Sequence, residues 1–412
     1  MKLRSIGFLA IFAGLISCSE DDSTNNNDTP LLTISALAGS FSDERWVFLT
    51  RKDGTLIEAR EIPSDGVDVV FERPSGLQDK SFVVHQMYHT VNSRSFLISS
   101  YTGITGGKLS LNAINPGSAL TEVGKHNYSF TNVPTGYSPS VTGPKVITYS
   151  SSGSNGTFSG TTTLGANNID LLYWFENNTN PLVVPKYTLV KNAAAGQTLS
   201  MSFADLTPAS EQTIVFDAKQ DYVDVFMGPV STEVPVMRLH SRLIWSDAAE
   251  IKLYYPGEAF DAYMTFIQTS IDNDRQDYMK TGSIPTNFKS IPASINSFSQ
   301  VSTTFTVTTS GSYDYLSASG YNRWIVNDLD YSISWSAHMD NSETNTFNIP
   351  ALPEAIVARY PVLSSAPITP FFFIEITDLN NLDNYSDYVS MTWNTEVFSP
   401  PTEYFRRAKI YR

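Results

Sequence analysis

Short apolar runs separated by turn residues are the feature of this sequence that most constrains its fold. From residue 31 onward, these runs are rich in Val, Ile, Phe, Tyr and Thr, the residue types that favour strands. Turn dipeptides such as Asp53-Gly54 and Pro256-Gly257 separate them. The pattern predicts strands at residues 46–49, 67–71, 82–88, 95–101, 145–149, 170–175, 251–255, 262–268, 303–308, 331–335, 371–376 and 388–393.

Helical periodicity is scarce by comparison. The best candidate covers residues 353–360, where Pro353 suits a first helical turn and Pro361 ends the segment. That length allows about two turns. So little helix among so many strands predicts an all-β fold, and short strands with frequent turns favour β-sandwiches.

Two stretches of the chain resemble one another at a spacing of about 90 residues. Residues 107–112 (GKLSLN) are similar to residues 197–202 (QTLSMS), and residues 81–84 (SFVV) are similar to residues 170–173 (DLLY). A unit of this size suits one Ig-like β-sandwich. We therefore predict tandem β-sandwich (Ig-like) domains with a larger C-terminal β-domain, at residues 31–120, 121–211 and 212–412.

Charge and cysteine content exclude several classes of protein. The chain has 412 residues and a formal net charge of -14. A general nucleic-acid binder carries a basic excess or stripe, so the acidic balance argues against nucleic acid as a partner. The single cysteine, Cys18, excludes an internal disulfide framework and any multi-cysteine metal site.

The N-terminus has the pattern of a secretory signal peptide at residues 1–17. Lys2 and Arg4 form a positively charged n-region, and residues 6–16 form an apolar h-region. This h-region is too short to cross a bilayer core of about 30 Å as a stable helix. No later run approaches the roughly 18 apolar residues that a transmembrane helix requires.

The h-region ends in Leu15-Ile16-Ser17-Cys18, with an aliphatic residue three positions before the cysteine and a small residue directly before it. This tetrad resembles the lipobox of bacterial lipoproteins. The resemblance implies thioether lipidation of the Cys18 sulfur, cleavage before Cys18 and acylation of the new N-terminus. Two or three acyl chains anchor a protein stably, because each buried CH₂ contributes about 0.8 kcal/mol.

A polar segment follows the lipidation motif. Residues 19–30 contain nothing that could form a core, so residues 18–30 are expected to form a lipidated, disordered tether. The acidic triplet Glu20-Asp21-Asp22 resembles the surface-export signal of Bacteroidota lipoproteins. That resemblance implies a protein lipid-anchored in the outer membrane, extracytoplasmic and exposed on the cell surface. The alternative is a plain soluble spacer, which leaves the periplasmic face open as well.

Catalytic and cofactor motifs are missing from the sequence. It contains no G-x-S-x-G elbow, no Walker-type G-x-x-x-x-G-K and no G-x-G-x-x-G. Cys18 is committed to lipid, which excludes a thiol nucleophile. We predict no cofactor and no enzymatic activity, and a hydrolase in the C-terminal domain is the remaining enzymatic alternative.

Metal ligands are sparse. His85 and His89 lie four residues apart in a predicted strand and so share one face, but no third ligand has suitable spacing and H-E-x-x-H is absent. Two oxygen-rich loops are weak Ca²⁺ candidates, although neither has the glycine or the final glutamate of an EF-hand. Their residues are Asp272, Asn273, Asp274 and Asp277 in the first, and Asp378, Asn380, Asp383 and Asp387 in the second. Solvated acidic turns are the preferred interpretation, and no metal is predicted.

The six tryptophans are possible sugar-stacking residues, because an exposed indole face matches the C–H side of a sugar ring. Core packing is the preferred interpretation for those near predicted strands. Trp324 follows Gly320-Tyr321-Asn322-Arg323 and lies nearest a loop, so it is the candidate for ligand stacking.

The preferred function is that of a lipid-anchored outer-membrane or cell-surface lipoprotein that acts as a non-catalytic binding or scaffold protein. Its expected partners are the membrane, through Cys18, and an outer-membrane protein or a glycan. The alternative is an accessory glycan-binding lipoprotein of a polysaccharide uptake system, which the layout of anchor and sandwiches resembles. A hydrolase ranks third.

Overall fold

Strands dominate the structure, a computed structural model that describes residues 30–36, 43–63, 65–90, 93–111, 120–154, 156–180, 183–229, 240–271, 274–393 and 401–411. The predicted all-β, sandwich-type fold is confirmed. The described residues contain two α-helices, α1 (Glu354–Arg359) and α2 (Tyr385–Trp393). No helix within these ranges is long and apolar enough to cross a membrane.

Helix α1 coincides with the predicted helix, whereas α2 replaces the strand predicted at residues 388–393, so that prediction was wrong. Asn384 precedes α2, and its side-chain oxygen accepts hydrogen bonds from two backbone N–H groups of the first turn, at 2.8 and 3.2 Å. Tyr385, Tyr388 and Val389 have the i, i+3, i+4 spacing of one helical face, and all three are buried. The cap and this periodicity outweigh the strand propensity of the aromatic and β-branched residues.

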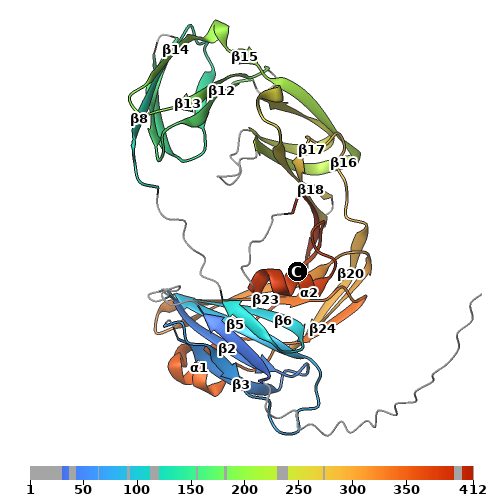
Figure 1. Ribbon diagram of the computed structural model, residues 1–412. Helices are drawn as coiled ribbons and strands as arrows, with labels where there is room; N and C mark the ends of the chain where they lie inside the picture. The colour runs from blue at the N-terminus through green and yellow to red at the C-terminus, as the bar shows by residue number, and fades with distance from the viewer. Residues whose placement is uncertain are drawn as a thin grey trace, which may run out of the picture.

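One twelve-stranded sheet runs through the molecule (Figure 1). In spatial order its strands are β17 (His240–Tyr255), β16 (Ser210–Pro229), β18 (Tyr263–Ile271), β19 (Asp274–Gly282), β26 (Glu403–Ile410), β25 (Phe371–Leu379), β22 (Tyr315–Val326), β23 (Leu329–Met339), β6 (Ser95–Ile104), β5 (Phe82–Thr90), β2 (Asp43–Thr50) and β3 (Leu56–Ile62). Neighbours are antiparallel except β23 and β6, which are parallel. This parallel pair joins the N-terminal strands to the C-terminal half of the chain.

Two three-stranded sheets cover opposite faces of β2, β5 and β6. Their strands, in spatial order, are β4 (Val69–Phe71), β1 (Leu32–Ala36) and β7 (Lys108–Leu111) in one, and β20 (Ala293–Val301), β21 (Thr304–Gly311) and β24 (Thr344–Asn348) in the other. Val47 packs in the core on the β1 side, together with α2. Phe48 packs in the core on the β21 side, together with α1. Strand β2 is therefore buried on both faces, which explains its unbroken apolar run.

Residues 124–208 form a separate β-sandwich with its own core. One sheet has the order β10 (Val146–Ser154), β11 (Thr157–Leu164), β8 (Gly124–Thr131) and β14 (Thr198–Ser202), and the other β15 (Thr207–Pro208), β13 (Lys186–Ala193), β12 (Ile169–Asn177) and β9 (Tyr137–Thr142). Tyr128, Phe130, Tyr173 and Phe175 are buried between the sheets. Figure 1 shows this sandwich at the opposite end of an arch from the N-terminal sandwich, with β16, β17 and β18 beside it.

The two sandwiches share one pattern of strand pairing. Strand β1 pairs antiparallel with β4 and parallel with β7, and β8 pairs antiparallel with β11 and parallel with β14. In the facing sheets, β5 lies between β2 and β6, and β12 lies between β9 and β13. The segments that resemble one another in sequence, residues 107–112 and 197–202, contribute the equivalent strands β7 and β14.

The arrangement differs from the predicted division at residue 120. The N-terminal sandwich does not end at β6, because β23 continues its sheet with a register that runs from Ser332 opposite Ser95 to His338 opposite Tyr101. Residues 31–111 and the C-terminal part thus share one sheet and one core. The apolar face of β6, which carries Phe96 and Ile98, packs in the same core as Ile333 and Trp335 of β23.

Candidate binding groove at the sheet edge

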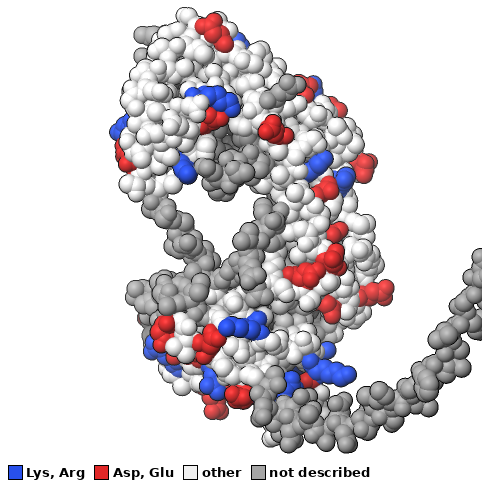
Figure 2. Space-filling model, viewed as in Figure 1, with Lys and Arg blue, Asp and Glu red and all other residues white. Residues whose placement is uncertain are grey.

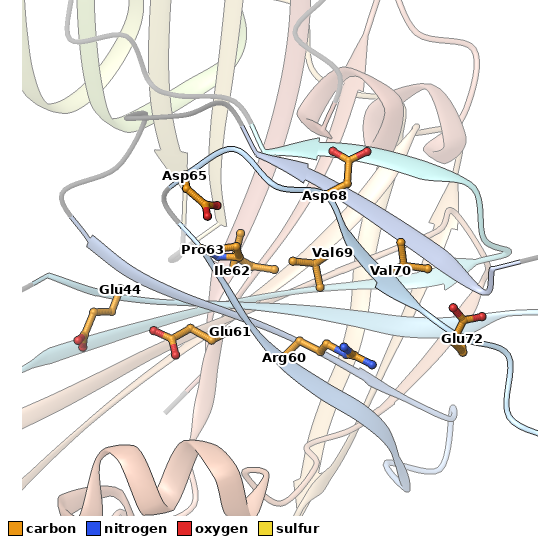
Figure 3. A pocket seen from close by; sticks show the side chains of 10 residues that line it. All are labelled: Glu44, Arg60, Glu61, Ile62, Pro63, Asp65, Asp68, Val69, Val70 and Glu72. Atoms are coloured by element: carbon orange, nitrogen blue, oxygen red, sulfur yellow. The ribbon is translucent and has the colours of Figure 1, made fainter.

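A groove with a volume of about 890 Å³ lies where the chain turns from β3 into β4. Ile62 and Val69 lie at its centre, and both are buried in the core on the β1 side. Figure 3 shows the acidic side chains arranged around this apolar pair. The lining residues are Glu44, Arg60, Glu61, Ile62, Pro63, Asp65, Asp68, Val69, Val70 and Glu72. We call this site the acidic groove.

Both strands that flank the acidic groove are edge strands. Strand β3 pairs only with β2 within the described part of the chain, and β4 pairs there only with β1. An edge strand leaves a row of backbone N–H and C=O groups without strand partners. The groove therefore combines an apolar centre with two accessible backbone edges.

The lining carries five carboxylates and one guanidinium, which is a clear excess of negative charge. Arg60 is held by Glu58 of the same strand, with 2.6 Å between Arg60 Nε and Glu58 Oε1. Glu61 and Glu72 have no ion pair to any described residue. Figure 2 shows Asp and Glu side chains beside Lys and Arg side chains on the lower body, which holds β2, β3 and α1. The unpaired carboxylates give the groove its net negative charge.

Glu44 forms one wall of the groove and is fixed by α1. The Tyr360 hydroxyl donates to Glu44 Oε2 at 2.5 Å, and the Arg359 guanidinium forms an ion pair with the same carboxylate. His89 Nδ1 lies 3.5 Å from Glu44 Oε2. The hydrogen bond from Tyr360 and then those from Arg359 lower the pKa of Glu44, although partial burial opposes them. Glu44 therefore stays ionised with its oxygens already bonded, and it serves mainly to shape the wall.

Asp68 forms the opposite wall and is held in a similar way. The Ser35 hydroxyl donates to Asp68 Oδ1 at 2.5 Å, and Lys108 Nζ donates to Oδ2 at 3.0 Å. These two hydrogen bonds lower the pKa of Asp68. The Asp65 carboxylate accepts a bond of 3.1 Å from the backbone of Val67 and so fixes the turn between β3 and β4. Glu61 and Glu72 remain as the carboxylates with free bonding capacity.

The acidic groove is built to attract a cation. No group of three or more His, Cys, Asp or Glu side chains within the described ranges is arranged to hold a metal ion. The carboxylates instead border an open apolar strip, a geometry that suits an elongated ligand with both apolar and positively charged groups. Lys and Arg side chains have both, because an aliphatic stem carries the charged head.

The sequence analysis did not single out the residues of this groove. Glu61, Asp65, Asp68 and Glu72 belong to no motif that predicts a site. The local density of acids at residues 58–72 was a usable signal. Their convergence on one groove depends on how β3 and β4 diverge, and the sequence pattern does not contain that information.

The residues predicted from sequence lie elsewhere. Cys18 and the tether up to residue 29 fall outside the described residues. Trp324 is only 8% exposed, its ring stacks against Tyr331, and its Nε1 donates to the backbone oxygen of Val362 at 3.3 Å. Its ring therefore offers no open face to a sugar. The exposed aromatic residue nearby is Tyr321, at 38% exposure.

The second calcium candidate does not form a shared cage. Asn380 is turned toward β26, where its amide bonds Thr402 Oγ1 at 2.7 Å and the backbone N–H of Glu403 at 3.0 Å. Asp387 Oδ2 accepts from the backbone N–H of Asp383 at 3.0 Å, inside the turn that starts α2. Burial raises the pKa of Asp378. These oxygens stabilise the local backbone.

The first calcium candidate is divided in a similar way. Residues 272–273 fall outside the described residues, and Asp274 and Asp277 belong to β19 rather than to a loop. Asp277 is buried and bonded by Arg275 at 3.1 Å and by Arg406. Asp274 pairs with Arg407 at 3.1 Å. Both carboxylates thus hold neighbouring strands of the sheet together.

The two paired histidines lie on one face of β5, as expected, but in different surroundings. His85 is fully buried between Phe48 and Trp335, and burial lowers its pKa to about 3. Its Nδ1 lies 2.7 Å from the Ser100 hydroxyl, and its Nε2 lies 2.9 Å from Thr50 Oγ1. His89 stacks on Phe96. His85 is therefore a satisfied core residue.

A smaller hollow of about 220 Å³ lies between the end of β6 and the β23–β24 connection. Its floor is apolar and contains Val83, Met339 and Phe347, all buried. Its rim is polar and nearly neutral, since one lysine and one aspartate accompany amides and hydroxyls. The rim residues are Lys52, Thr102, Asp340, Ser342, Thr344, Asn345, Thr346 and Asn348.

In comparisons with known proteins, no model of a protein family matches the chain, and no curated protein matches it.

Proposed function

We propose that this protein is a lipid-anchored lipoprotein of the outer membrane, facing the cell exterior, which captures a positively charged segment of a partner protein in the acidic groove. It acts as a non-catalytic binding or scaffold protein. The lipobox ending in Cys18 and the polar tether support the anchoring. The groove supports the binding role, because an excess of carboxylates borders an apolar strip between two free strand edges.

The groove is the observation that carries the proposal. Glu61 and Glu72 form no ion pair with any described residue, although Arg359 lies near enough to Glu61 to interact with it electrostatically, so both carboxylates can attract a cation. Pro63 and Val70, which are half-buried, supply the apolar contact that a charge alone would not provide, above the buried Ile62 and Val69. An acidic surface of this kind also speeds the encounter with a basic partner, most strongly at low ionic strength.

Anchoring is tested by changing Cys18 to Ser in the full chain and following its location in the cell. The wild-type protein should incorporate labelled fatty acid and sediment with outer membranes, and external protease should cleave it on intact cells. The Cys18→Ser chain should carry no label and leave the membrane fraction. Equal membrane retention of both chains would rule out the lipid anchor, and protection from external protease would place the protein on the periplasmic face.

Groove binding is tested by titrating soluble protein from residue 30 onward with two fluorescent peptides of equal length, one lysine-rich and one glutamate-rich. The lysine peptide should bind, and its affinity should fall as salt rises. Glu61→Lys should weaken binding by about tenfold. Glu122→Lys makes the same charge change in the second sandwich, outside the groove, and should have no effect. Equal binding of both peptides, or equal effects of both variants, would refute the groove as the site.

A second candidate function is glycan binding at the smaller hollow. Its volume of about 220 Å³ lies below the roughly 300 Å³ at which pockets for drug-sized ligands begin, so it suits a single ring. Its hydroxyl and amide rim over an apolar floor matches the two faces of a neutral sugar. In a glycan array, Thr344→Val should abolish any specific signal, whereas Thr308→Val, directly opposite in the strand register, should not. An unchanged signal with Thr344→Val would exclude this hollow.

A further inference from the structure

We propose that the partner segment binds the acidic groove as an added β-strand, paired with the free edge of β3, and that it alternates apolar residues with lysine or arginine. This inference rests on the proposed function, since it gives the geometry and the sequence pattern of the ligand for the same groove.

The edge of β3 provides the template. Strand β3 pairs with β2 on one side, and no other described strand pairs with it. In an antiparallel pair, successive residues alternate in the direction of their backbone groups, so about half of the N–H and C=O groups of an edge strand point away from the sheet. With seven residues, β3 offers about 24 Å of edge. Strand β4 has only three residues, so β3 is the better template.

The two sides of β3 differ in chemistry only at the end that lines the groove, and this end sets the pattern of the ligand. Farther along the strand, Arg60 and Glu58 lie on the same side as Ile62, and Ala59 lies on the same side as Glu61. Ile62 faces the core on the β1 side, next to Val69 of β4. Glu61 points to the opposite side of the sheet, because neighbouring residues of a strand alternate between the faces, and it lies across from Trp46. An added strand must alternate in the same way. At the groove, its residues on the first side meet Ile62, Val69 and the stem of Arg60, whose guanidinium is bonded to Glu58, and its residues on the second side meet Glu61 and Glu44.

Charged residues on an edge strand also guard a sheet against edge-to-edge aggregation, and this is the competing explanation. A guard needs charges on the edge strand itself. In the groove, Asp65 belongs to the turn, and Asp68 and Glu72 flank β4 without lying within it. This placement surrounds the open strip, which is the arrangement that a bound basic strand requires.

The experiment uses an eight-residue peptide that alternates valine with lysine, titrated into the soluble protein from residue 30 onward by fluorescence anisotropy. Two further peptides carry backbone N-methyl groups on either the odd or the even residues. N-methylation removes one set of N–H donors and blocks close approach on that side. The two methylated peptides are matched controls for each other, because their charge and composition are identical.

Strand addition predicts that one methylated peptide binds like the parent and that the other loses at least about tenfold in affinity. The parent peptide should also slow amide hydrogen exchange in residues 56–62. If both methylated peptides bind like the parent, the groove binds the basic segment but strand addition is wrong. If the parent peptide fails to bind and Glu61→Lys makes the protein self-associate, the acids are an edge guard and the proposed function fails as well.

Discussion

The indole Nε1 of Trp335 donates a hydrogen bond of 2.7 Å to the hydroxyl of Ser100, a residue 235 positions earlier in the chain. Ser100 is fully buried, and His85 Nδ1 lies 2.7 Å from the same hydroxyl. The serine thus accepts from the tryptophan and has its own proton available for the histidine. This network spans the parallel junction of β6 and β23, and it ties the N-terminal sandwich to the C-terminal half.

Ser100→Ala should destabilise the protein by about 2 kcal/mol, because it leaves the Trp335 N–H and His85 Nδ1 buried without partners. Urea denaturation measures the change. Ser95→Ala is the matched control in the same strand: Ser95 is exposed, so its loss should cost no more than about 0.5 kcal/mol. Equal effects of the two substitutions would mean that the buried network adds nothing.

Excised residues 120–209 should fold cooperatively on their own, because every core residue of this sandwich lies within that segment. Excised residues 31–111 should not, because Phe48, Phe96 and Ile98 would lose the C-terminal half that covers them. Circular dichroism with urea titration distinguishes the two outcomes. A cooperative transition in residues 31–111 alone would contradict the shared core.

His338 should make the protein less stable in mild acid. Burial lowers its pKa to about 4, whereas the unfolded chain has a histidine pKa near 6.5. The unfolded state therefore binds more protons between these values, and stability present above pH ~6.5 is lost as the pH falls toward ~4. The loss amounts to about 3 kcal/mol. His338→Gln should reduce this slope in urea unfolding measured between pH 7 and 4.5, and the slope that remains comes in part from the buried His85, whose pKa is also lowered. An unchanged slope would disprove the assignment.

Trp324→Ala should act on stability and lower the free energy of unfolding by about 3 kcal/mol, because the indole is only 8% exposed. Tyr321→Ala removes a neighbouring aromatic ring that is 38% exposed and should cost far less. Thermal unfolding of both variants gives the comparison. If Tyr321→Ala proved the more damaging, the packing described for β22 would be wrong.

Short apolar runs in the sequence predicted strands correctly where the strand is buried. The run at residues 46–49 was predicted as a strand, and it forms β2 with apolar residues on both faces. The parallel pairing of β6 with β23 was beyond prediction, because it joins residues more than 200 positions apart and leaves no local signal. Helix α2 was not predicted, because the strand propensity of its residues pointed to a strand. The Asn384 cap stabilises the helix and outweighs that propensity.

The acidic groove could not be predicted from the sequence, for a similar reason. Its carboxylates are ordinary surface acids in sequence, and only the divergence of β3 from β4 brings Glu61 and Glu72 around one apolar strip. Trp324 illustrates the converse. The residues before Trp324 predicted a nearby loop and an exposed ring. The turn lies after Trp324 instead, at Asn327 and Asp328, and the indole packs against the core.

A charge swap tests the central claim, capture of a basic segment by the acidic groove, most directly. Glu61 and Glu72 are both changed to Lys, and the affinities of the valine–lysine peptide and of a valine–glutamate peptide are measured for both proteins. The account predicts that the wild type prefers the lysine peptide and that the double variant prefers the glutamate peptide, each by about tenfold. An unchanged preference in the double variant, with the fold intact by circular dichroism, would contradict it.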